Sequence, residues 1–286
     1  MANQQQIQQA LDEGESLKMI TQAYSEIAAV KLRQIRTGIE RTRVFFEEVS
    51  KVFRAVEVAA AQQKVNPKLQ KKDTVSILLT SNHRFYGNLE EKLIRYFILN
   101  TTKFKTDRII VGKTALEFLQ AMKYAYRYTS VVFRDDNPSP SESDQLVGQI
   151  TGYEQILVYY PRMESTLVQE PHVVDLLQQP PKHYLQSKVR SFDYIFEPEL
   201  EKILKFFDQQ IISVLLEQTF LEADLARTAA RLVSMDEAQA KAEDFIKDQR
   251  KLLFRVKMSA DNMHLLETLA TVLTARKEKE KSTYAQ

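Results

Sequence analysis

The C-terminal part of the chain contains neither glycine nor proline, and this feature most limits what the chain can fold into. From Glu199 to Gln286 the sequence is rich in Leu, Ala, Glu, Lys, Gln and Arg, which are all good helix formers. The simplest interpretation is one continuous helix. Its apolar positions alternate in steps of four and three, which is the spacing of a coiled-coil seam. The predicted seam consists of Leu221, Leu225, Thr228, Leu232, Met235, Gln239, Ala242, Ile246, Gln249, Leu253, Val256, Ala260 and Met263.

Several of these seam residues are polar or small, among them Thr228, Gln239 and Ala242. Small residues favour close approach of two helices, and polar ones tolerate partial hydration at a cost in stability. Such a seam suits a shaft that other proteins surround.

The N-terminal segment, residues 2–64, has a similar pattern. Its apolar residues recur in steps of three, four and seven, with one step of eight between Ile27 and Ile35. At about 1.5 Å per residue, the two segments would reach on the order of 90 Å and 120 Å. No compact domain needs helices of that length inside it. The predicted stripe consists of Leu17, Ile20, Tyr24, Ile27, Ile35, Ile39, Phe46, Val49, Phe53, Val56 and Ala60.

Strand and helix patterns alternate between these two segments, and all eight prolines lie here, from Pro67 to Pro198. Short apolar runs bounded by polar turns predict strands, and the alternation favours a small, largely parallel sheet. The predicted strands are 74–80, 108–111, 156–160 and 192–196, the predicted helices are 89–99 and 114–122, and 135–144 is expected to be a loop.

The expected fold is therefore an α/β insert plus long helices. An antiparallel coiled coil of the N- and C-terminal helices would carry a small Rossmann-like α/β domain between them. The expected domains are an N-terminal helix at 1–65, the α/β domain at 66–196, and a C-terminal helix with a charged tail at 197–286.

The sequence contains no constellation that indicates catalysis, a cofactor or a metal. There is no cysteine, which excludes disulfides and thiolate chemistry. Gly112-Lys113-Thr114 follows a predicted strand, as a phosphate-binding loop would, but Asp107 occupies the position where that motif needs its first glycine. A tight strand-to-helix turn is the better interpretation. A nucleotide-binding α/β enzyme with helical arms therefore remains only as a second rival function.

The remaining titratable residues also favour structural roles. The four histidines are scattered through different elements without metal-ligand spacing. Asp135, Asp136 and Glu142 fall in the expected loop, where solvated side chains are the usual outcome. No apolar run is long enough to span a membrane, the N-terminus resembles neither a signal nor a transit peptide, and a formal net charge of +2 does not favour nucleic-acid binding.

Basic residues are frequent on both long helices, and two explanations remain open. They are either a solvated helix face or an electrostatic contact with an acidic ring of partner subunits. On the first helix they are Lys31, Arg33, Arg36, Arg41, Arg43, Lys51 and Arg54, and on the last helix Arg227, Arg231, Lys247, Arg250, Lys251, Arg255 and Lys257.

The segment from Ser16 to Arg33 resembles the N-terminal signature of the gamma subunit of F-type ATP synthases, roughly T-x-K-I-T-x-A-M-x-x-V-A-A-x-K-L-R. The segment 194–198 is similar to the Y-x-Y/F-E-P of that family, and 229–238 is similar to its A-A-R-M-V-A-M-x-x-A. The V-G-R/K and V-Y-x-x-F-x-S-x-x-x-Q motifs have counterparts at 111–113 and 158–169. The resemblance covers nearly the whole chain.

The sequence also departs from the family pattern at four places, one of which is the first fifteen residues, Gln-rich and acidic where the family is basic. Where the family usually has S-D-R-G-L-C-G-G-L-N, this chain clearly keeps only Ser81, Gly87 and Leu89 over Ser81–Glu90, so a local contact of the middle domain is expected to differ. Arg227 stands where the family usually has a glutamate, and the usual small-residue ending is replaced by residues 266–273 and a charged tail. We therefore expect rearranged charge pairing in the shaft and an altered tip.

The resemblance implies a central-stalk rotor subunit, which couples ion flow (H⁺ or Na⁺) through a membrane ring to conformational change in a catalytic hexamer. The implied partners are the alpha and beta subunits, the epsilon subunit and the membrane c-ring, at the cytoplasmic face of a bacterial plasma membrane. The chain itself would not be an enzyme. The first rival is a non-rotary coiled-coil scaffold. By resemblance, the rotor contacts are Ile20, Thr21, Lys31, Leu32, Arg33, Arg36, Arg231, Met235, Arg250 and Arg255.

Overall fold

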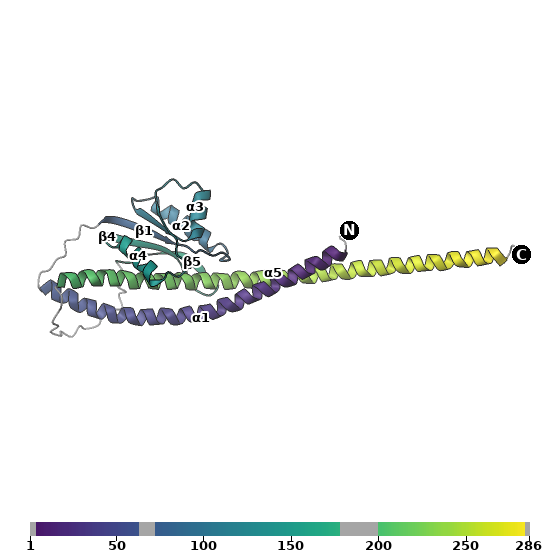
Figure 1. The fold of residues 1–286 in the computed structure, drawn as a ribbon, viewed down its shortest axis with the longest axis horizontal. Coiled ribbons are helices and arrows are strands. Elements are labelled where there is room, and N and C mark those ends of the chain that lie inside the picture. The colour runs from purple at the N-terminus through teal and green to yellow at the C-terminus, as the bar shows by residue number, and fades with distance from the viewer. Residues whose placement is uncertain (1–3, 63–71, 178–199, 284–286) are drawn as a thin grey trace. The chain divides into compact units, whose positions relative to one another are not determined.

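The computed structural model describes residues 4–62, 72–177 and 200–283. Two long helices frame an α/β domain, as expected: α1 at Gln4–Gln62 and α5 at Leu200–Thr283 (Figure 1). The chain divides into two compact units. The distal unit combines Met1–Ser25 with Met235–Gln286, and the proximal unit is Glu26–Ser234. Among the described residues, no helix is long and apolar enough to cross a membrane.

The proximal unit contains a five-stranded sheet in the order β3-β2-β1-β4-β5. The first four strands are mutually parallel, and β5 is antiparallel to β4. The strands are β1 (Lys72–Leu79), β2 (Asp107–Val111), β3 (Thr129–Val131), β4 (Tyr153–Met163) and β5 (Gln169–Asp175). The shorter helices are α2 (Leu89–Thr101), α3 (Lys113–Ala121) and α4 (Pro140–Ile150). The parallel arrangement of β1 to β4 confirms the predicted largely parallel sheet.

Alternation along β1 explains how the layers form. Ile77 and Leu79 face one side of the sheet, where they pack with buried residues of α4 and with Leu216 and Phe220 of α5. Leu78 faces the other side and packs with buried residues of α2 and α3. Helix α5 is thus part of the domain core, which fixes the domain to the long helix.

Helix α1 packs along another side of α5 in the proximal unit. Leu32 and Ile35 form a buried cluster with Leu225 and Ala229 of α5. Because the sheet covers one side of α5 and α1 another, every α5 residue from 223 to 230 is buried. A helix segment that is covered on all sides needs small residues, and four of these eight positions are alanine.

Two expectations for the middle domain need correction, and a third concerns residues outside those that the structure describes. The predicted loop 135–144 is wrong in its second half, because α4 begins at Pro140 with a capping box formed by Ser139 and Glu142. Strands β3 and β5 were not expected. The strand predicted at 192–196 lies outside the described residues.

The predicted seam of α5 is confirmed from Leu221 to Val256, where each position is buried or half-buried. The predicted stripe of α1 is wrong in its N-terminal part, because Leu17, Ile20 and Ile27 are 50%, 54% and 61% exposed. The buried positions there are other residues, mostly smaller ones: Ile7, Leu11, Gly14, Thr21 and Ala28.

Candidate functional site

The turn at Gly112 has no free backbone amides to offer a phosphate. The backbone N–H groups of Lys113, Thr114 and Ala115 donate to oxygens of residues 80–82, at distances of 3.1, 3.1 and 3.3 Å. Gly112 has φ +100°, and a Cβ there would lie 2.4 Å from the carbonyl oxygen of Thr80. The first amides of α3 therefore bind the end of β1. This supports the strand-to-helix turn over the phosphate loop.

The acidic residues of the segment before α4 are structural and not merely solvated. Asp136 is buried and accepts hydrogen bonds from the backbone N–H of Asn82 (2.6 Å) and the hydroxyl of Tyr86 (2.8 Å). Asp135 accepts a hydrogen bond from the backbone N–H of Asp136. This bond, with a weaker contribution from His83, lowers the pKa of Asp135. The solvated role expected for these residues is wrong for Asp136, and wrong also for Glu142, which caps α4.

His83, Asp135 and Asp136 lie close enough together to suggest a cation site. Both oxygens of Asp136 already accept hydrogen bonds from the chain, and one oxygen of Asp135 faces His83 at 3.3 Å. The group is thus explained as the support of the segment that joins β3 to α4.

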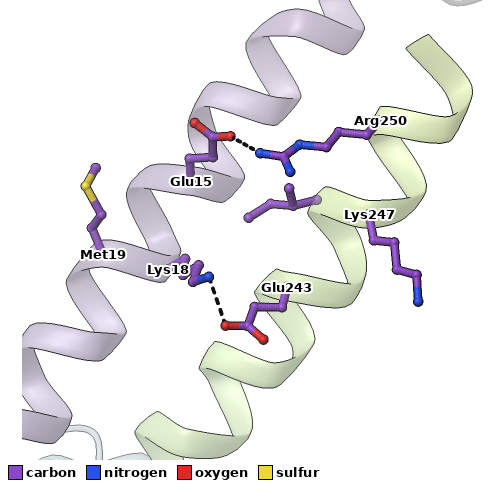
Figure 2. Close-up of a pocket in the computed structure, with 7 residues that line it drawn as sticks. Glu15, Lys18, Met19, Glu243, Lys247 and Arg250 are labelled. Carbon is purple, nitrogen blue, oxygen red and sulfur yellow. Dashed lines mark hydrogen bonds and ion pairs between the residues drawn. The ribbon is translucent and has the colours of Figure 1, made fainter. Parts of the chain in front are cut away.

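The two helices of the distal unit are antiparallel and joined by polar contacts at their edges. Glu15 pairs with Arg250 at 2.8 Å, and Lys18 pairs with Glu243 at 3.0 Å (Figure 2). These pairs flank a shallow groove. The hydrogen bond from Lys18 holds the pKa of Glu243 below its usual range. Such exposed pairs favour one register of the helix pair but contribute little stability.

Between the helices of the distal unit the packing is close. A Cβ on Gly14 would lie 3.0 Å from Cγ1 of Ile246, so this glycine is a point of close approach between the two helices. Further along the pair, Ser25 donates to Asp236 at 2.8 Å.

Two apolar surfaces of the distal unit are exposed. On α1, Leu17, Met19 and Ile20 are exposed, and Met19 extends away from α5 in Figure 2. On α5, every residue from 257 to 275 is exposed, and no other described part of the chain covers this end. Its large apolar residues are Met258, Met263, Leu265, Leu266, Leu269, Val272 and Leu273. Exposed apolar helix faces of this extent indicate a surface that other proteins cover.

The structure places the ten predicted contact residues in three settings. Thr21, Leu32 and Met235 are buried. Three others bind within the chain: Lys31 to Asp224 at 2.8 Å, Arg231 to the hydroxyl of Tyr86 at 2.7 Å, and Arg250 to Glu15. The remaining four are exposed: Ile20, Arg33, Arg36 and Arg255.

Sequence reasoning missed a buried polar cluster where α5 meets the α/β domain. Arg227, expected on a solvated or partner-binding face, is only 1% exposed and pairs with Glu90 of α2 at 3.0 Å. The signal was present, because Arg227 and the segment Ser81–Glu90 are both departures from the family pattern.

The fold and these surfaces define a class of protein: a long antiparallel helix pair that carries an α/β domain, with exposed faces for partners and no catalytic constellation among the described residues. The family model described as ATP synthase matches residues 3–256. The chain belongs to that ATP synthase family.

Curated relatives and solved structures agree with this assignment. The ATP synthase gamma chain of Staphylococcus saprophyticus is 21% identical over 93% of this chain and 97% of its own length. That of Vesicomyosocius okutanii is 24% identical over 96% of this chain and 100% of its own length.

The fold is similar to a chain in the central stalk/c-ring structure of the Tetrahymena thermophila mitochondrial ATP synthase, with a TM-score of 0.58 and 19% identity, covering 77% of this chain and 99% of that one. A chain of the Euglena gracilis mitochondrial ATP synthase has a TM-score of 0.52 and 16% identity, with 88% and 96% covered. The chain is thus a non-catalytic, gamma-type rotor subunit of a rotary ATP synthase, and the non-rotary scaffold is not favoured.

Proposed function

We propose that the helix pair of α1 and α5 turns inside an alternating hexamer of alpha and beta subunits, while the α/β domain binds the epsilon subunit and stands on the membrane c-ring. The location would be the cytoplasmic face of a bacterial plasma membrane, and the transported ion H⁺ or Na⁺. The rotor would comprise the helices at 1–65 and 197–286 and the domain at 66–196.

The observation that carries this proposal is the exposed end of α5. Its large apolar residues between Met258 and Leu273 would cost free energy in water, at roughly 25 cal/mol per Å² of apolar surface, unless a partner covers them. A ring of subunits around the helix would cover all of its sides at once.

Rotation would act on the partners through the asymmetry of the shaft. The exposed contacts differ around the helix pair: Leu17, Met19 and Ile20 form an apolar surface on α1, and Arg255 lies on α5. Each subunit of the ring would meet a different face as the shaft turns. Differential contacts of this kind bias the conformation of a binding site and hence its nucleotide affinity.

Of the predicted contact residues, the four exposed ones, Ile20, Arg33, Arg36 and Arg255, are proposed to touch the ring directly. The other six are Thr21, Lys31, Leu32, Arg231, Met235 and Arg250, and they are proposed to act by holding the shaft in shape, since each is buried or bound within the chain.

Co-expression with the alpha and beta subunits of the same organism tests this proposal. The full chain should co-purify with both subunits, and the complex should couple ATP hydrolysis to ion pumping in membrane vesicles. A chain ending at Val256 should lose coupling, whereas a chain ending at Thr274, which lacks only the charged tail, should retain it. Failure of the full chain to co-purify would favour the scaffold, and nucleotide binding by the isolated chain would favour the enzyme.

A further inference from the structure

The α/β domain is attached to α5 by a buried arginine in addition to apolar packing. The Nε of Arg227 donates to Oε1 of Glu90 at 3.0 Å, and its Nη2 donates to the carbonyl oxygen of Leu79 at 3.0 Å. Leu79 ends β1, and Glu90 lies in the first turn of α2. A single side chain of α5 thus holds both ends of the segment 80–89.

Two further contacts extend this attachment along α5. One turn beyond Arg227, the Nη2 of Arg231 donates to the hydroxyl of Tyr86 at 2.7 Å, and its guanidinium lies 4.5 Å from the centre of that ring. Tyr86 in turn donates to Asp136. Near Ser234, Gly87 has φ +59°, and a Cβ there would lie 3.1 Å from the serine Oγ. The segment Ser81–Glu90 therefore follows α5 over about two helical turns.

If the pair of Arg227 and Glu90 breaks, Arg227 keeps its hydrogen bond to Leu79, and Glu90 keeps the weaker influence of the Ser81 N–H and hydroxyl. Oε2 of Glu90 and Nη1 of Arg227 form no hydrogen bond with any described residue. Burial raises the pKa of Glu90, and the charge of Arg227 opposes that shift. A buried ion pair adds little net stability, but removing one partner leaves the other charge buried without a counter-charge. Its best-supported role in proteins is to fix one register of packed elements.

Glu90 and Arg227 are both positions at which the sequence departs from the family pattern. In this chain the domain accepts through Glu90 and the shaft donates through Arg227. The two departures lie 3.0 Å apart and pair with each other.

We propose that this buried pair, Arg227 with Glu90, positions the α/β domain on α5 so that the domain and the shaft turn as one body. Apolar contacts are not directional, so alone they would only weakly resist sliding of the domain along α5. The hydrogen bonds to Glu90 and Leu79 are directional and would break if the domain shifted by one helical turn. This inference rests on the rotor function proposed above, and it assigns Arg227 a positioning role.

The test uses the complete complex in membrane vesicles and measures ions pumped per ATP hydrolysed. Glu90→Asn and Arg227→Glu should each lower this ratio severalfold while hydrolysis continues. The double variant Glu90→Gln with Arg227→Met leaves neither charge buried without its partner, so it should assemble but still pump fewer ions per ATP. Glu90→Gln, which keeps the shape of the side chain, provides a second single variant if Arg227→Glu does not assemble. Lys92→Met is the matched control, because its pairing with Glu170 at 3.9 Å lies within the domain and away from α5.

The outcomes separate this inference from the function on which it rests. If the unaltered chain does not assemble or couple, the rotor function fails. If it couples and the single variants couple equally well, with only a lower melting temperature of the purified chain, the pair serves folding alone and the positioning role is refuted. A double variant that assembles and pumps as many ions per ATP as the unaltered chain would also refute the positioning role.

Discussion

Replacing Gly112 by alanine should destabilise the α/β domain, and two separate free-energy costs contribute to the loss. The residue has φ +100° and ψ 152°, a region that only glycine occupies freely, and a side chain forced there costs about 1–3 kcal/mol. The added Cβ would also lie 2.4 Å from the carbonyl oxygen of Thr80, which belongs to the backbone and cannot rotate away. Overpacking of this kind costs roughly 1–3 kcal/mol. The expected loss is thus roughly 2–6 kcal/mol.

Two other glycines of the same domain are matched controls. Gly152 also has a positive φ, at +98°, but a Cβ there meets nothing within 4 Å, so Gly152→Ala should show only the backbone cost. Gly148 lies inside α4 with open space around it, and Gly148→Ala should stabilise by about 0.5–1 kcal/mol. Urea unfolding of the purified chain, followed by tyrosine fluorescence, measures all three. If Gly112→Ala were as stable as Gly148→Ala, the close turn between β1 and α3 would be refuted.

Three smaller perturbations test other parts of the structure. Ala229→Leu should destabilise by about 1–3 kcal/mol in the same urea assay, because its site between α5 and α1 is full, whereas Ala260→Leu on the exposed part of α5 should be neutral. Burial, together with the nearby charge of Arg162, lowers the pKa of His172, so the unfolded chain binds more protons and stability should fall as pH drops below about 6.5. His172→Phe should remove that part of the acid sensitivity, and an unchanged pH profile would contradict it. Lys18→Met should raise the pKa of Glu243 toward its usual value in a carboxyl NMR titration, and no change would mean that the pair does not form in solution.

The long helices could be predicted from the sequence because nothing interrupts them. Absence of glycine and proline over α5, with a repeating four-three pattern, leaves few alternatives to a coiled coil. The parallel order of the sheet also followed from local patterns, since apolar runs such as 74–80 and 108–111 alternate with helical ones.

The face of α1 that contacts α5 could not be predicted from hydrophobicity. Two apolar patterns coexist on this helix between residues 17 and 28, and the larger residues, such as Leu17 and Ile20, are exposed. The helix pair instead buries Thr21 and Ala28, because small side chains permit close approach. The step of eight between Ile27 and Ile35 marked the change from one pattern to the other. An isolated sequence does not say which of two apolar faces a partner will cover.

The polar cluster at α5 was also beyond prediction from local patterns. Arg227 lies in a helix segment that is covered on all sides, but arginine is mostly found at the surface, so its sequence alone predicts an exposed side chain. Its partner, Glu90, is separated from it by 137 positions in the sequence. Pairings of this range depend on the tertiary arrangement, and the departures from the family pattern marked only where to look.

Single-molecule rotation tests the central claim most directly. Because the chain has no cysteine, a Gln120→Cys variant, at an exposed position of α3, would take a bead at one site on this chain. In a complex whose other subunits lack reactive cysteines and whose alpha and beta subunits are fixed to a surface, the bead should rotate in one direction while ATP is present and stop when ATP is removed. A complex that hydrolyses ATP and pumps ions while the bead stays still, or that couples fully without this chain, would contradict the account.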